Sequence, residues 1–203
     1  MASLLLRRGG CAAAAILLSS LPFAAHARNA EPTAEAVAML SAGDFVWNAA
    51  HTIPAKPAAM RIVISIADQK LYLYQGATLL AVSAVSTGKP GHDTPTGDFK
   101  ILQKQVDHKS SLYDDAPMPY MQRLTWDGVA IHAGRDPGFA DSHGCVRVPL
   151  AFAKKLFAVT RIGARVSVVD ESLATEPDPQ MPDDPLALGL EAPAPEDISA
   201  LQP

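Results

Sequence analysis

One short stretch of the sequence gathers the residues best suited to covalent chemistry. Residues 131–149 read IHAGRDPGFADSHGCVRVP and hold Cys145, with His143 two positions before it and His132 thirteen before it. A cysteine with an ordinary pKa of about 8.5 is a weak nucleophile near neutral pH unless a base or a positive field acts on it. An imidazole within hydrogen-bond reach is such a base. Because Gly144 tolerates a tight turn, we interpret Cys145 as a nucleophile carried on a turn.

The two histidines are not equivalent candidates for the base. His143 and Cys145 are two residues apart on one turn, a spacing that does not reliably bring the side chains together. His132 ends the strand-like run GVAIH and is separated from Cys145 by a loop long enough to fold back. A contact of about 2.6 to 3.2 Å is set more easily by two rigid elements. We therefore predict that His132 is the base and that His143 shapes the turn or contacts substrate.

Two other interpretations of these residues stay open on spacing alone. A lone cysteine is often a small, inert, buried hydrophobe. His132, His143 and Cys145 could also ligate zinc, although the sequence contains neither C-x-x-C nor H-E-x-x-H and lacks a full ligand set. We expect no metal and no other cofactor.

The same residues carry a resemblance to a known family. SHGCVR, preceded by IHAG, closely resembles the signature of the L,D-transpeptidase (YkuD-like) catalytic domain. VSTGKPGHDTPTGDFKI and MPYMQRLTWDGVAIH extend the resemblance over roughly residues 60 to 169. One departure is the segment between His132 and Ser142, which is shorter than in many members. The resemblance favours the thiol-enzyme interpretation over the other two.

The resemblance implies roles for specific residues. Cys145 and His132 are the implied catalytic pair, and the backbone carbonyl of Ala133 orients the imidazole. The implied oxyanion site and its turn comprise Ser142, His143 and Gly144, with the N–H of Cys145. Implied substrate contacts are Arg147, Thr94 and Gly134. For Arg147 two roles remain open, since it could pair with a substrate carboxylate or hold the turn.

The implied activity is periplasmic L,D-transpeptidation of peptidoglycan stem peptides through a cysteine thioester. The acceptor would be the amine of another stem, which forms a crosslink, or of a protein, which becomes attached to the wall. Two alternatives remain: an L,D-carboxypeptidase that passes the same thioester to water, and a noncatalytic wall-binding protein.

Hydrophobic alternation predicts a mainly β fold, a β-rich α+β class with one or two short helices. The resemblance adds a mixed-sheet sandwich to this expectation. The segments with strand patterns are 61–67, 70–75, 78–88, 98–106, 117–126, 128–132 and 165–170. Helices are expected near residues 33–40 and from 150 onward, after Pro149. Residues 106–116 show no period and predict an excursion or lid in which His108 is exposed to solvent.

The flanking segments differ in composition from the centre. Residues 1–27 combine Arg7 and Arg8 with an apolar run and a small-x-small site, which predicts a cleaved secretory signal and a periplasmic location. Residues 28–59 form an Ala/Pro-rich segment and linker, and residues 60–170 the catalytic domain. Residues 171–203 are an acidic, Pro-rich tail that we expect to be disordered. We expect a monomer with no nucleic-acid partner and no stable membrane span.

Overall fold

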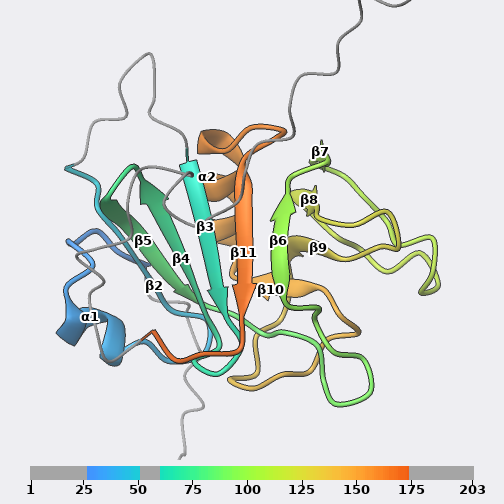
Figure 1. The fold of residues 1–203 in the computed structure, drawn as a ribbon, viewed down its shortest axis with the longest axis horizontal. Coiled ribbons are helices and arrows are strands. Elements are labelled where there is room, and N and C mark those ends of the chain that lie inside the picture. Colours follow the sequence, from blue (N-terminus) through green and yellow to red (C-terminus); the bar gives the residue numbers. More distant parts are fainter. Residues whose placement is uncertain (1–26, 51–59, 174–203) are drawn as a thin grey trace, which may run out of the picture.

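The computed structural model describes residues 27–50 and 60–173, which form two β-sheets with two helices (Figure 1). Almost all of the predicted signal, the 51–59 part of the linker and residues 174–203 of the predicted tail lie outside the described residues. The fold is mainly β with mixed sheets and few helices, which confirms the predicted class. Neither described helix is long and apolar enough to cross a membrane.

The larger sheet has seven strands. They are β1 (Ala27–Arg28), β2 (Phe45–Trp47), β3 (Met60–Ser65), β4 (Lys70–Gln75), β5 (Thr78–Ala84), β6 (Gly97–Lys100) and β11 (Arg165–Val169). Their order is β1-β2-β5-β4-β3-β11-β6, so an antiparallel β3–β4–β5 meander lies at the centre. The meander follows directly from the three alternating runs in the sequence.

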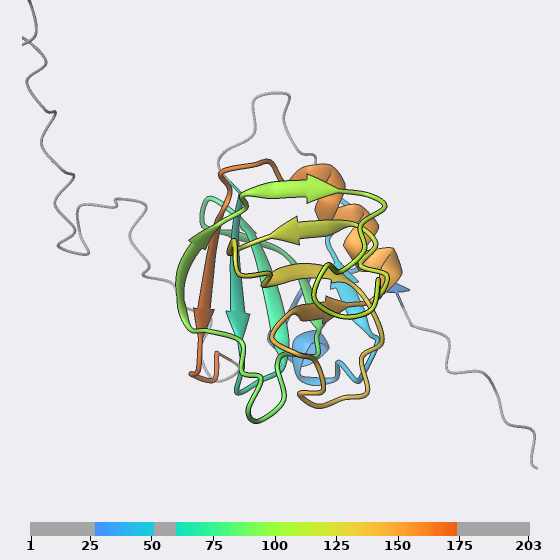
Figure 2. The same ribbon diagram turned by 90° about the vertical axis from the view of Figure 1, so that its right-hand side faces the viewer.

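The smaller sheet has four strands and presents its outer face to the viewer in Figure 2. They are β7 (Gln103–Gln105), β8 (Met121–Arg123), β9 (Ala130–Ala133) and β10 (Val146–Val148), in the order β10-β9-β8-β7. β8 and β9 are antiparallel, whereas β9 and β10 run parallel. This parallel pair places the strand that holds His132 beside the strand that follows Cys145.

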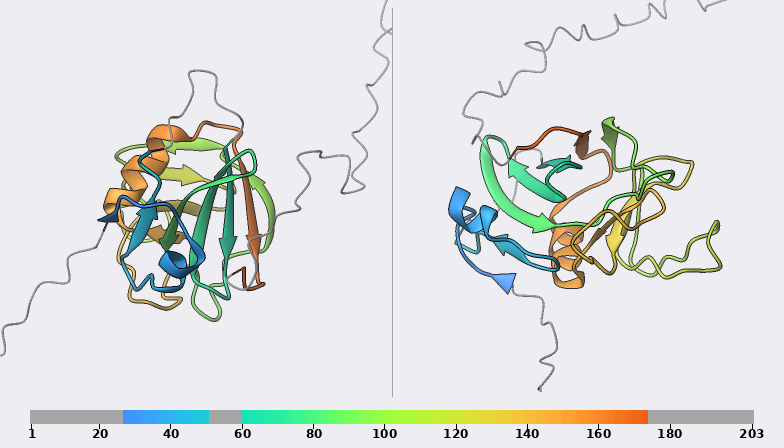
Figure 3. Two further views of the ribbon diagram at one scale, coloured as in Figure 1. Left: turned by 90° about the vertical axis from the view of Figure 1, so that its left-hand side faces the viewer. Right: turned by 90° about the horizontal axis from the view of Figure 1, so that it is seen from below.

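The core lies between the two sheets and is closed at one side by helix α2 (Leu150–Val159) (Figure 3). Phe152 of α2 packs edge-on against Phe45 and Trp47, with ring centroids 5.5 and 5.8 Å apart. Ile131 and Val146 contribute from the smaller sheet and are almost fully buried. The predicted helix is present, and Phe152, Ala153 and Leu156 form its buried face. Leu150, which the apolar spacing also placed on this face, is exposed.

The segment before residue 60 belongs to the folded unit. Helix α1 (Ala34–Ala38), capped by the Thr33 hydroxyl at 3.2 Å, packs Val37 against the outer face of the larger sheet. Tyr72 lies in this second cluster, and its exposed fraction is only 4%. Because Phe45 and Trp47 enter the main core, the fold begins earlier than the family-like segment predicted from residue 60.

Two strand predictions need correction. Residues 98–106 are not one strand: β6 ends at Lys100 in the larger sheet and β7 begins at Gln103 in the smaller one. The chain changes sheets at Ile101, whose side chain is fully buried. β10 was not predicted, because three residues are too few to show a period.

Candidate active site

The parallel pairing of β9 and β10 places the predicted catalytic pair on one face of the smaller sheet. Arg147 is in register with His132, and Val146 with Ile131. Side chains alternate along a strand, so Ile131 and Val146 face the core while His132 and Arg147 face outward. Cys145 directly precedes β10 and shares the outward face. His132 on β9 and Cys145 directly before β10 thus lie on the same face of the smaller sheet.

The His132 imidazole is held by its own backbone neighbour. Nδ1 lies 2.9 Å from the carbonyl oxygen of Ala133. A carbonyl oxygen can only accept, so Nδ1 carries the proton and Nε2 has a free lone pair. Burial lowers the pKa of His132 to about 4, helped by the charges of Arg147 and His108, while the Ala133 hydrogen bond opposes this shift. At neutral pH the imidazole is therefore neutral and can accept a proton.

The Cys145 thiol is half-buried and also neutral. Burial raises its pKa, and a backbone hydrogen bond from Ala130 and the charges of Arg147 and Arg123 only partly oppose the increase. The thiol donates to the carbonyl oxygen of Gly128 across 3.5 Å. The free protein therefore holds a thiol and an imidazole rather than a thiolate–imidazolium pair, so deprotonation must accompany attack.

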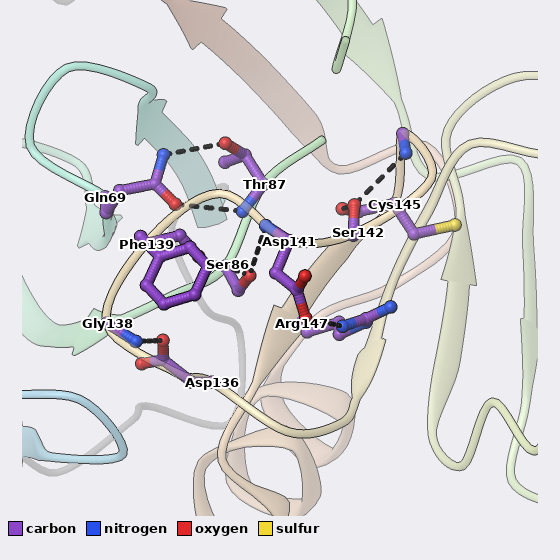
Figure 4. Close-up of polar contacts among 11 residues, drawn as sticks. Gln69, Ser86, Thr87, Asp136, Gly138, Phe139, Asp141, Ser142, Cys145 and Arg147 are labelled. Atoms are coloured by element: carbon purple, nitrogen blue, oxygen red, sulfur yellow. Dashed lines mark hydrogen bonds and ion pairs between the residues drawn. The ribbon is translucent and has the colours of Figure 1, made fainter. Parts of the chain in front are cut away.

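The turn that carries Cys145 is held by the side chain of Ser142. Its Oγ donates to the carbonyl oxygen of Cys145 at 2.5 Å and accepts from the N–H of Gly144 at 3.1 Å. Gly144 has a φ of +109°, which a residue with a Cβ rarely adopts. The N–H of Gly144 is thus engaged within the turn, which leaves those of His143 and Cys145 as the candidate oxyanion donors. Figure 4 shows the sulfur directed away from the Ser142 contacts.

Thr94 also holds this turn, through two hydrogen bonds of its hydroxyl group. Its hydroxyl donates to the carbonyl oxygen of Gly144 at 2.9 Å and accepts from the N–H of Gly88 at 2.8 Å. Only 4% of Thr94 is exposed. The implied role in substrate contact is therefore corrected to one in positioning the turn, because the hydroxyl is buried and committed. Gly88 is required there, since a Cβ at Gly88 would lie 2.0 Å from the carbonyl oxygen of His92.

Arg147 links β10 to the loop between His132 and the turn. Its guanidinium lies 3.5 Å from the carboxylate of Asp141 (Figure 4). A Cβ on Gly134 would come within 3.0 Å of the Arg147 side chain, so glycine leaves the room that Arg147 occupies. Because its charge is already paired, the geometry favours the turn-holding role of Arg147 over recognition of a substrate carboxylate.

His143 points toward two other loops. Its ring centroid lies 4.8 Å from that of His92 and 4.8 Å from that of Tyr113. Tyr113 belongs to the lid loop, which we define as residues 106–119, so this contact ties the lid to the nucleophile turn. No group of three or more His, Cys, Asp or Glu side chains in residues 27–50 and 60–173 is arranged to hold a metal ion.

Two residues that received no role from the sequence also lie at the site. Arg123 of β8 is in register with Ala130 and acts electrostatically on Cys145. His108 of the lid loop was expected to be exposed, but it is half-buried and lies 3.4 Å from Arg123. The sequence carried no signal for Arg123, because its place at the site depends on the register between β8 and β9.

Comparison with known proteins identifies the family of the chain. The family model of the YkuD L,D-transpeptidase catalytic domain matches residues 59–168. The probable L,D-transpeptidase YbiS of Escherichia coli (strain K12) is 30% identical over 149 residues, 58% of this chain and 47% of the relative. The putative L,D-transpeptidase YkuD of Bacillus licheniformis is 28% identical over 111 residues, 53% of this chain and 64% of the relative. The match thus spans less than two thirds of either relative.

Solved structures share the fold. An L,D-transpeptidase from Stackebrandtia nassauensis superposes with a TM-score of 0.52 at 25% identity, over 61% of this chain and 60% of that chain. One from Mycobacterium smegmatis gives a TM-score of 0.52 at 22% identity, over 55% of this chain and 59% of that chain. The family match covers more than half of the sequence and contains both members of the predicted catalytic pair, His132 and Cys145. The chain belongs to the L,D-transpeptidase family with a YkuD-type catalytic domain.

Proposed function

We propose that the protein is a periplasmic L,D-transpeptidase that acts on peptidoglycan stem peptides through a thioester on Cys145. The observation that carries this proposal is the placement of a neutral thiol and a neutral imidazole on neighbouring strands of one sheet face. The Ala133 carbonyl fixes the imidazole tautomer so that Nε2 is the proton acceptor. A base in this state can take the thiol proton as the sulfur attacks a carbonyl.

The reaction runs in two acyl transfers. Cys145 Sγ attacks the carbonyl carbon of the third, L-configured residue of a donor tetrapeptide, and His132 takes the thiol proton. Collapse of the tetrahedral intermediate breaks the peptide bond, and His132 returns the proton to the departing D-amino acid. An acceptor amine then attacks the thioester, loses its proton and releases Cys145 as a thiol. The acceptor is a second stem or a protein amine.

The oxyanion of the tetrahedral intermediate requires donors beside the sulfur. The N–H groups of His143 and Cys145 lie on the turn that presents the thiol, and the Gly144 N–H is engaged with Ser142. Backbone donors cost no reorganisation when they are fixed in advance. The bonds from Thr94 and Ser142 supply that rigidity, because both end on backbone oxygens of the turn.

Muropeptide analysis tests the activity. Purified protein is incubated with sacculi, which are then digested and examined by mass spectrometry. We expect new crosslinks between third residues, or stem peptides attached to protein, with loss of the terminal D-residue and none of these products from Cys145→Ala. Tripeptides without crosslinks or attached protein would instead identify a hydrolase. Sacculi left unchanged by a folded protein that binds them would contradict catalysis.

Export is a second part of the proposal. The residues that support it are the Arg7–Arg8 pair, the apolar run and the Ala25-His26-Ala27 site. Mass spectrometry of protein recovered from the periplasm should find a mature chain that begins at Arg28. An intact N-terminus that retains Cys11 would contradict cleavage and the expectation of a single cysteine in the mature protein.

A further inference from the structure

A second guanidinium, that of Arg123, acts electrostatically on the Cys145 thiol and has no part in the steps above. Arg123 is directly opposite Ala130 in the β8–β9 ladder, and Ala130 makes the backbone hydrogen bond to the Cys145 sulfur. Opposed residues in an antiparallel ladder have Cα atoms about 4.5 to 5.5 Å apart and side chains on the same face. The Arg123 side chain therefore starts close to the reacting sulfur, on the outward face of the smaller sheet.

Neutral side chains orient this guanidinium. Arg123 Nε donates to Gln103 Oε1 at 2.9 Å, and an Nη lies 3.4 Å from Nε2 of His108. The Nδ1 of His108 lies 3.0 Å from the Oε1 of Gln105, which can only accept, so Nε2 is left to accept from Arg123. Burial and the Arg123 charge lower the pKa of His108 and keep it neutral. These partners fix the direction of Arg123 without neutralising its charge.

The charge of Arg123 is available to a ligand. A guanidinium has five N–H donors, and the two contacts above leave at least three of them. No Asp or Glu oxygen in residues 27–50 and 60–173 lies within 4.0 Å of its nitrogens, whereas Arg147 is paired with Asp141. A half-buried, oriented and uncompensated guanidinium suits a carboxylate, which it can bind through two parallel hydrogen bonds.

We propose that Arg123 binds the α-carboxylate of the D-amino acid that leaves the donor stem. This assignment rests on the proposed function, because the ligand is the leaving group of that reaction. The carboxylate is bonded to the carbon next to the scissile nitrogen, so it lies only a few bonds from the carbonyl carbon that Cys145 attacks. Arg123 lies opposite Ala130, and its charge acts on the sulfur, which fits this short separation. Binding there aligns the scissile bond and selects stems that end in a free acid.

Two donors that differ in one group test the assignment. A tetrapeptide stem ending in D-alanine is compared with its C-terminal amide, and kcat/KM for release of the terminal residue is measured with the full mature chain. In Arg123→Gln, kcat/KM for the acid should fall about 10- to 100-fold, the effect of losing a hydrogen bond to a charged group. The amide should lose much less in kcat/KM, because it loses only the effect of the Arg123 charge on the thiol, and its remaining turnover also shows that the variant is folded. Arg123→Lys should restore part of the preference for the acid.

Alkylation of Cys145 gives a readout that does not depend on transpeptidation. Iodoacetate and iodoacetamide form the same thioether bond and release iodide, but only iodoacetate carries a carboxylate. The ratio of their rate constants at one pH cancels the thiolate fraction, so it reports attraction of a carboxylate to the site. The ratio should fall about 3- to 10-fold in Arg123→Gln. It should stay unchanged in Arg165→Gln, a matched loss of charge at an exposed position of the larger sheet.

Each outcome decides between the assignment and a rival. Equal losses for acid and amide without rescue by Arg123→Lys would show a merely structural residue and overturn the proposal. A ratio that falls only in Arg147→Gln would move carboxylate binding to Arg147 and also overturn it. If the wild-type protein turns over neither donor, the proposed function fails. The alkylation ratio then still shows whether Arg123 attracts a carboxylate.

Discussion

Burial shifts the pKa values of Cys145 and His132, the proposed catalytic pair, in opposite directions. It raises the pKa of the Cys145 thiol and lowers that of the His132 imidazole to about 4. Both shifts favour the uncharged forms, so the free protein stores a protonated nucleophile next to an unprotonated base. A thiol kept in this state is less open to alkylation and oxidation than a thiolate. Substrate binding must bring the carbonyl carbon of the donor close to the sulfur before the proton moves from Cys145 to His132.

The low pKa of His132 has a consequence for stability. Between the ordinary histidine value of about 6.5 and the folded value of about 4, the unfolded chain binds a proton that the folded chain does not. The free energy of unfolding should therefore fall as the pH drops through this window, by up to about 3 kcal/mol from this residue. Urea unfolding at several pH values should show a smaller decline for His132→Asn than for the wild type. An equal decline in both would contradict the assigned pKa. The exposed His143→Asn serves as the matched control and should keep most of the wild-type decline.

The nucleophile turn depends on elements distant in sequence. Ser86, in the segment that follows β5, forms two backbone hydrogen bonds with Arg147 of β10, each of 3.0 Å. Further along the same segment, Thr87 accepts from the N–H of Ser142, also at 3.0 Å. Thr94 then closes the turn through the carbonyl oxygen of Gly144. The position of the sulfur is thus set by the segment that follows β5 of the larger sheet as well as by the smaller sheet.

Thr94→Val tests this support, because it replaces a hydroxyl with a methyl group of similar size. The N–H of Gly88 and the carbonyl oxygen of Gly144 would lose their buried partner, at a cost of about 1 to 3 kcal/mol. We expect a lower urea midpoint and slower acylation of Cys145. Thr96→Val, at an exposed position of the same loop, should change neither quantity. Equal behaviour of the two variants would show that Thr94 does not hold the turn.

The sequence predicted some elements well for identifiable reasons. The meander at residues 60–84 shows clear alternation, and α2 shows helical spacing after Pro149. The split at Ile101 could not be read from alternation, because a strand that crosses between sheets keeps an apolar residue at the corner. The roles proposed for His132 and Cys145 rest on residue types, spacing and resemblance. The placement of Arg123 requires the β8–β9 register, which a residue pattern does not specify.

At the scale of the molecule, the folded unit is larger than the segment that matches the family. β2 pairs with β5 and carries Phe45 and Trp47 into the core beside Phe152. The preceding loop also reaches the active-site loop, since Gly43 N–H donates to a carboxylate oxygen of Asp136 at 3.0 Å. The N-terminal segment is therefore structural support for the catalytic domain.

Phe45→Ala measures how much the N-terminal segment contributes to the free energy of unfolding. Phe45 is fully buried between the larger sheet and α2, and truncation of a buried phenylalanine costs about 3 to 5 kcal/mol. Denaturant unfolding should show a loss of this size. Phe139→Ala removes the same side chain from a position that is 60% exposed and should change stability little. If the two variants were equally stable, β2 would not be part of the cooperative core.

Cys145 is expected to carry the acyl group during the reaction, and intact-mass spectrometry with a donor tetrapeptide can detect this intermediate. Without an acceptor amine, the mature protein should gain the mass of the donor minus its terminal D-amino acid. Peptide mapping should place the adduct on Cys145, and hydroxylamine should remove it as expected for a thioester. His132→Ala should form the adduct far more slowly, and Cys145→Ala should form none. Release of the D-amino acid by Cys145→Ala, or an adduct mapped to another residue, would contradict the account.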